Sequence, residues 1–131
     1  MAGRTLHILI ADDEASVTQS LTFVLNYDGH RIEAVSDGGQ AYDRLTAKDA
    51  DFDLLITYDA MPVLSGLELV RKLRAFRFRG KILVLLACLL PALEQAYRDL
   101  GVDAIHHKPF DIAPLRLAVE QLGAAMDKST H

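Results

Sequence analysis

The segment Ile8-Leu9-Ile10-Ala11-Asp12-Asp13-Glu14 joins a short apolar run to three consecutive acidic residues. The apolar part has the length and aliphatic content of a buried β-strand. Directly after it, Val17, Leu21 and Leu25 recur at the spacing of one helix face. A buried strand that leads through a short turn into an amphipathic helix is typical of the strand-helix-strand units of a parallel sheet.

The same alternation continues along the chain. We predict five strands, at 6–11, 31–36, 53–58, 81–86 and 104–107, with a helical pattern after each. Ser65 and Glu68 have the spacing of a capping box at the start of the third helix, Pro91 suits the first turn of the fourth, and Gly101 suits its end. The chain is therefore expected to have an α/β fold.

Length and composition indicate one domain. Of 131 residues, half are hydrophobic and about a quarter charged, with a formal net charge of −4. We predict a domain over 1–126 and a frayed tail over 127–131. The negative charge argues against nucleic acid as the main partner. The single cysteine, Cys88, and the lack of a secretion signal predict a cytoplasmic protein. We predict no membrane segment, because no apolar run reaches about twenty residues.

Polar residues follow the strands at the edge where an open parallel sheet binds ligands. Asp12 and Asp13 follow the first strand, and Lys108 follows the fifth. Adjacent carboxylates opposite an ammonium group suit a hard divalent cation together with a phosphoryl group. The acidic turn disfavours the alternative of a small flavodoxin-like enzyme or cofactor carrier, because a bound flavin mononucleotide would need a loop rich in Gly, Ser and Thr there.

Three motifs resemble the signatures of the receiver domain of two-component response regulators, in family order and spacing. They are the segment 8–14, the segment 61–68 (Met-Pro-Val-Leu-Ser-Gly-Leu-Glu) and Lys108-Pro109-Phe110. The resemblance, to single-domain chemotaxis-type receivers, covers nearly the whole chain. It implies a flavodoxin-like, doubly wound, five-stranded parallel sheet of order 2-1-3-4-5 between two layers of helices. It also implies an aspartate that takes a phosphoryl group from a histidine kinase, Mg²⁺ held by Asp12 and Asp13, phosphoryl contact by Lys108 and a cis bond before Pro109.

The chain departs from the family pattern at the phosphoacceptor position. That position lies four residues before the proline of the Met-Pro pair, and here Tyr58 occupies it, with Asp59 one residue late. Neighbouring side chains on a strand point to opposite faces of the sheet. If the Tyr58 side chain points into the pocket, we therefore expect the Asp59 side chain to point away from it, unless the backbone bulges there. A neutral phenol is a poor Mg²⁺ ligand, so we expect Tyr58 to act as a plug and any Mg²⁺ site to be weakened.

Two further departures agree with this interpretation. The hydroxyl residue that receivers place after the fourth strand is Leu86 here, and the aromatic residue of the fifth strand is Ile105. The loop after the fourth strand is unusually apolar: it either folds over Tyr58 or is exposed to a partner or a second copy. Cys88, Leu89, Leu90 and Tyr97 are the predicted partner surface.

The sequence therefore predicts a pseudo-receiver, not an enzyme, that signals by contact with a histidine kinase or an effector and without phosphorylation. By the resemblance, the fourth helix, fifth strand and fifth helix supply the contact, and a homodimer is compatible with it. A working phosphoacceptor that uses Asp59 after a local backbone rearrangement is the main alternative. Asp12 and Asp13 have the simpler alternative of a solvated helix N-terminus.

Overall fold

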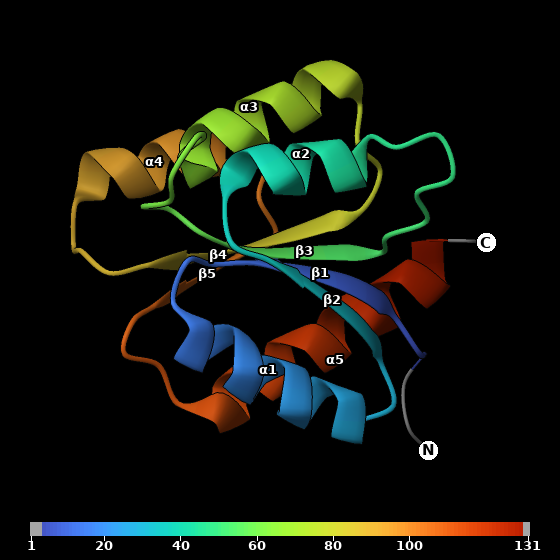
Figure 1. The fold of residues 1–131 in the computed structure, drawn as a ribbon. Helices are drawn as coiled ribbons and strands as arrows, with labels where there is room; N and C mark the ends of the chain where they lie inside the picture. Colours follow the sequence, from blue (N-terminus) through green and yellow to red (C-terminus); the bar gives the residue numbers. More distant parts are fainter. Residues whose placement is uncertain (1–3, 130–131) are drawn as a thin grey trace.

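Strands and helices alternate throughout the computed structural model, which describes residues 4–129 (Figure 1). The elements in chain order are β1 (His7–Ala11), α1 (Ala15–Tyr27), β2 (Arg31–Val35), α2 (Gly38–Leu45), β3 (Leu54–Tyr58), α3 (Gly66–Phe76), β4 (Lys81–Leu86), α4 (Pro91–Asp99), β5 (Ala104–His107) and α5 (Ile112–Ser129).

The sheet is parallel, with the strand order β2-β1-β3-β4-β5. Helices α2, α3 and α4 cover one face, and α1 and α5 cover the other (Figure 1). The predicted flavodoxin-like sheet between two helical layers is therefore confirmed. Among the residues described, no helix is long and apolar enough to cross a bilayer.

The element boundaries follow from local sequence. Strands β4 and β5 begin and end as predicted, and the other three are one residue shorter at one end. Ser65 and Glu68 form the predicted capping box of α3, with the Glu68 N–H donating to the Ser65 hydroxyl at 3.1 Å. The tail predicted to fray, 127–131, is helical as far as Ser129, and 130–131 lie outside the described residues.

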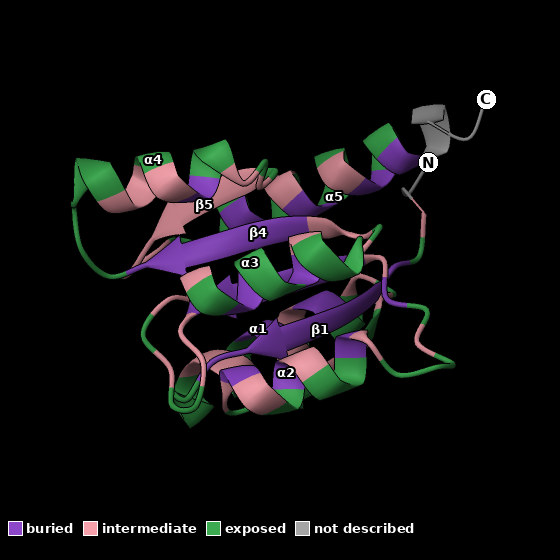
Figure 2. Ribbon diagram, turned by 90° about the horizontal axis from the view of Figure 1, so that it is seen from above, coloured by how far each residue is buried: buried purple, intermediate pink, exposed green. Residues whose placement is uncertain are grey.

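The core has two halves, one on each face of the sheet. β1 is buried along its whole length (Figure 2), and its side chains alternate between the halves. Leu9 and Ala11 pack on the side of α2, α3 and α4, whereas Ile8 and Ile10 pack on the side of α1 and α5. Burial of each such large aliphatic side chain contributes roughly 1.5–3 kcal/mol, so the apolar run of β1 anchors the fold.

Candidate functional site

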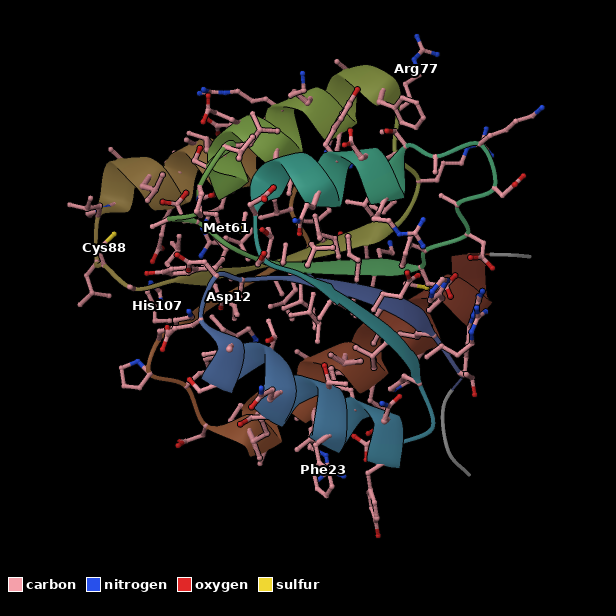
Figure 3. The ribbon with its side chains drawn as sticks, viewed as in Figure 1. Asp12, Phe23, Met61, Arg77, Cys88 and His107 are labelled. Carbon is pink, nitrogen blue, oxygen red and sulfur yellow. The ribbon has the colours of Figure 1, made fainter. Side chains whose placement is uncertain are left out.

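The candidate site lies at the edge where the parallel strands end. Figure 3 shows Asp12, Cys88 and His107 at this same end of the molecule. Asp12 directly follows β1, Tyr58 is the last residue of β3, and Lys108 directly follows β5. The sheet order brings these strand ends together, because β1 and β4 flank β3, and β5 pairs with β4.

Asp12 is buried and held on both carboxylate oxygens. Its Oδ1 accepts a hydrogen bond of 2.9 Å from the Glu14 backbone N–H, and its Oδ2 lies 2.7 Å from the Lys108 ammonium in an ion pair. Glu14 completes the group, with its carboxylate accepting from Lys108 at 3.0 Å. Asp13, in contrast, is exposed. Of the two predicted metal-side acids, only Asp12 therefore reaches Lys108.

Tyr58 lies beneath the same ammonium group. The Lys108 Nζ is 3.5 Å from the centre of the Tyr58 ring, a cation–π contact. The ring also packs against the half of the core on the α1 and α5 side. The Lys108 ammonium group therefore contacts the face of the Tyr58 ring. A groove lined by Val17, Tyr58, Phe110 and other residues opens beside this contact.

Lys108 is held as a cation in this position. Burial by itself would lower the pKa of its ammonium group, but the Asp12 and Glu14 carboxylates outweigh burial and raise that pKa. Only 10% of the side chain is exposed. The peptide bond from Lys108 to Pro109 is cis, as predicted. The Lys108 ammonium group thus contacts the Asp12 and Glu14 carboxylates and the Tyr58 ring within the protein itself.

Asp59 faces the opposite side of the sheet from Tyr58. Its carboxylate accepts a hydrogen bond from the hydroxyl of Tyr97, a residue of α4 that packs in the other half of the core. The backbone of Asp59 is fixed as well, because its N–H donates to Leu85 O at 3.2 Å and its carbonyl accepts from the Gly66 N–H at 2.7 Å. No bulge turns the Asp59 carboxylate toward Lys108.

The predicted partner surface needs one correction. Tyr97 is wholly buried, because its ring packs in the core and its hydroxyl bonds to Asp59, so it is not available to a partner. The rest of the predicted surface is exposed: Leu89 by 81%, Leu90 by 56%, and Cys88 also. The apolar loop after β4 therefore stands out from the molecule and does not fold over Tyr58 as a lid.

Both predicted switch positions hold aliphatic side chains that pack in the core. Leu86 is fully buried at the end of β4, and Ile105 on β5 packs against the same half of the core. Sequence reasoning missed two partners at this end of the sheet: Glu14 as a ligand of Lys108, and Tyr97 as the donor to Asp59. The acidic run 12–14 signalled the first, whereas nothing in the sequence linked Tyr97 to Asp59.

Comparison with known proteins places this arrangement in a family. The family model described as the response regulator receiver domain matches residues 8–120. The chain belongs to the response regulator receiver family. The response regulator MprA of Mycolicibacterium vanbaalenii is 36% identical over 110 residues, which are 84% of this chain and 47% of that protein. The response regulator RppA of Synechocystis is 34% identical over 110 residues, with the same coverage of 84% and 47%.

Solved structures agree with the fold. A CheY-like receiver domain protein from Methanospirillum hungatei has a TM-score of 0.89 at 21% identity, over 96% of this chain and 99% of that one. The chemotaxis protein CheY4 of Vibrio cholerae has a TM-score of 0.81 at 27% identity, over 91% of this chain and 99% of that one. The receiver domain spans about half the length of the curated relatives that it matches. It is a domain of two-component signalling, in a family that is in general not enzymatic.

Receiver domains typically bind Mg²⁺ at their phosphorylation site, but the donor set of this receiver domain does not fit the ion well. Asp12 is neutralised by Lys108, Asp13 is exposed, and Asp59 faces away. Within residues 4–129, no three His, Cys, Asp or Glu side chains are grouped so that they could hold a metal ion. Mg²⁺ prefers several oxygen ligands in near-octahedral geometry, and the side chain beside Lys108 at the end of β3 is the Tyr58 ring, which has no carboxylate oxygen.

Proposed function

We propose that this receiver domain signals by protein contact without being phosphorylated, and that any Mg²⁺ binding at its site is weak. The observation that carries the proposal is that Tyr58 and Asp59 point to opposite faces of the sheet. The Tyr58 ring lies against Lys108, and the Asp59 carboxylate accepts from Tyr97. A phosphoryl donor at the Asp12 and Lys108 side therefore meets the Tyr58 phenol at the end of β3, and the Asp59 carboxylate lies on the other face.

The neighbouring residues support the same proposal. Lys108 already has Asp12 and Glu14 as partners, so its charge is compensated in the absence of a phosphoryl group. Leu86 has no hydroxyl with which to contact a phosphoryl group, and Ile105 has no ring to move in response. The exposed loop at Cys88, Leu89 and Leu90 is the proposed contact for a histidine kinase or an effector, because exposed apolar side chains that lie together are typical of interaction sites.

Intact-mass measurement tests the proposal directly. The protein is incubated with Mg²⁺ and acetyl phosphate, a small phosphodonor that needs no kinase. We expect no stoichiometric phosphoryl adduct. An adduct that disappears in Asp59→Asn would instead establish the alternative, a functional acceptor at Asp59. Tyr58→Asp is the positive control, because it places a carboxylate beside Lys108 and Asp12.

A further inference from the structure

We infer that α4 is clamped in one position by contacts from three other parts of the fold, so that the face formed by α4 and β5 does not depend on the phosphorylation pocket. This inference rests on the proposed function, since it explains how a receiver domain without a phosphoacceptor keeps one signalling conformation. We call these contacts the α4 clamp: Tyr97 with Asp59, Glu94 with His107, and Arg74 with the carbonyls of Leu100 and Gly101.

The contact from the β3–α3 turn lies deepest in the core. Tyr97 is fully buried, and its hydroxyl donates to the Asp59 carboxylate. Burial first, and then the hydrogen bond to Asp59, raise the pKa of Tyr97 far above its ordinary value, so the phenol remains a donor at any physiological pH. Hydrogen bonds to a charged group are stronger than neutral ones, and a buried hydroxyl that loses its acceptor costs free energy. Moving α4 outward would break this bond.

Gly66, the first residue of α3, makes room for that bond. A Cβ atom at this position would lie 2.6 Å from the Tyr97 hydroxyl oxygen and 2.6 Å from the Tyr58 carbonyl oxygen. Both approaches are too close for any real side chain. The same glycine donates its N–H to the Asp59 carbonyl at 2.7 Å. Gly66 therefore holds the backbone of Asp59 in place and leaves space for the hydroxyl of Tyr97.

The other two contacts hold the remaining parts of α4. Near its start, Glu94 Oε1 lies 2.6 Å from Nε2 of His107, the last residue of β5. Just past its end, Arg74 of α3 donates from Nε to Leu100 O at 2.7 Å and from Nη2 to Gly101 O at 2.9 Å. A cation at the carboxyl end of a helix also meets the negative end of the helix dipole. Rotation or translation of α4 would disturb all of these contacts together.

Hydrogen–deuterium exchange of the peptides that cover α4 tests the clamp. Tyr97→Phe and Asp59→Ala should each raise the α4 exchange rate at least about tenfold, because each removes one side of the same buried bond. The double variant should exchange no faster than the faster single variant, because the effects of one shared contact do not add. Asp59→Asn keeps an acceptor oxygen, so it should restore most of the protection.

Controls separate the clamp from general destabilisation. Tyr42→Phe removes a hydroxyl from a partly buried ring on α2 and should leave α4 exchange unchanged. Amides of β1 report global opening: if α4 exchange in Tyr97→Phe rises no more than β1 exchange, the clamp is disproved. If the Tyr97 variants do not fold, Arg74→Met tests the third contact, with Arg71→Met on the same helix as its exposed control; equal exchange in the two would also disprove the clamp.

The clamp and the proposed function fail in different measurements. A phosphoryl adduct on Asp59 in the unaltered protein would refute phosphorylation-independent signalling. An α4 exchange rate that rises no more than the β1 rate in Tyr97→Phe, in a protein that still takes no phosphoryl group, would refute the clamp alone.

Discussion

At the carboxyl edge of the sheet, Lys108 is enclosed by residues from two separate parts of the chain. Asp12 and Glu14 supply carboxylates at 2.7 and 3.0 Å, and the Tyr58 ring centre lies 3.5 Å from the ammonium. The Asp12 side chain is wholly buried, so its charge is tolerated because Lys108 compensates it. The pair therefore has a structural role that does not require a phosphoryl group.

Lys108→Met should lower the free energy of unfolding by about 3 kcal/mol, because it leaves the Asp12 carboxylate buried without a cation. Urea denaturation measures the change. Asp12→Asn in the same background should recover part of the loss, since an amide is uncharged and its oxygen still accepts from the Glu14 N–H. Strictly additive losses would show that the two side chains do not depend on each other.

Tyr58→Asp should strengthen Mg²⁺ binding, with a dissociation constant roughly tenfold lower, because it supplies the missing oxygen ligand beside Asp12. Isothermal titration calorimetry gives the constant. Tyr58→Phe is the matched control and should not change it. If Tyr58→Asp gives no gain in affinity, the side chain at this position does not point into the pocket.

The helices differ in how their first turns are stabilised, and the difference reflects the site. α3 has a reciprocal capping box, in which the Ser65 N–H donates to Glu68 at 3.0 Å and the Glu68 N–H donates to Ser65 at 3.1 Å. α1 has Glu14 at its N-cap position without a side-chain cap. The Glu14 carboxylate bonds to Lys108 instead. The residue at the start of α1 therefore contacts Lys108 at the candidate site, whereas the residues at the start of α3 stabilise the helix itself.

Ser65→Ala should lower the free energy of unfolding by about 1 kcal/mol, because the Glu68 N–H loses its acceptor at the start of α3. The midpoint of chemical denaturation reports the loss. Ser20→Ala, at an exposed position within α1, is the control and should change stability by less than about 0.5 kcal/mol. Equal effects of the two substitutions would show that the capping box contributes nothing.

In the molecule as a whole, the end opposite the candidate site is held by polar contacts between segments that are far apart in the sequence. Arg116 of α5 pairs with Asp28, which follows α1, and the His30 Nδ1 accepts from the Leu6 N–H at 3.0 Å. As an acceptor, His30 is a neutral ring with its proton on Nε2. Burial lowers the pKa of His30 below its ordinary 6.5, although the nearby charge of Asp28 partly opposes this.

Stability should therefore fall as the pH decreases below the ordinary histidine value of 6.5. As the pH falls, the unfolded chain binds a proton on His30 at a higher pH than the folded chain does. The stabilisation that comes from neutral His30 is therefore complete above the ordinary histidine pKa. It is lost as the pH falls toward the lower pKa of the folded state. The slope from one group is at most about 1.4 kcal/mol per pH unit.

Melting temperatures across about pH 5 to 8 measure this dependence. His30→Asn keeps an acceptor but does not titrate, so it should flatten the curve in this range. Burial, and then His107, lower the pKa of His106 too, so His106→Asn should flatten the curve separately. A curve that keeps its slope in both variants would assign the dependence to other groups.

Local sequence was enough to predict the alternation of strands and helices, the capping box of α3 and the position of Tyr58 at a strand end. Periodicity and turn chemistry act over a few residues, and the receiver motifs then supplied the strand order. The sequence also predicted the separation of Tyr58 from Asp59, because neighbouring side chains on a strand alternate.

Only the tertiary structure decided what those side chains contact. Asp59 and Tyr97 are 38 positions apart, and Glu14 and Lys108 are 94 apart. No local pattern records which distant donor reaches a given carboxylate, because that choice depends on how helices pack across the sheet. For the same reason Tyr97, which we predicted on the partner surface, is a core residue instead: its ring fills space between α4 and the sheet that only the assembled fold creates.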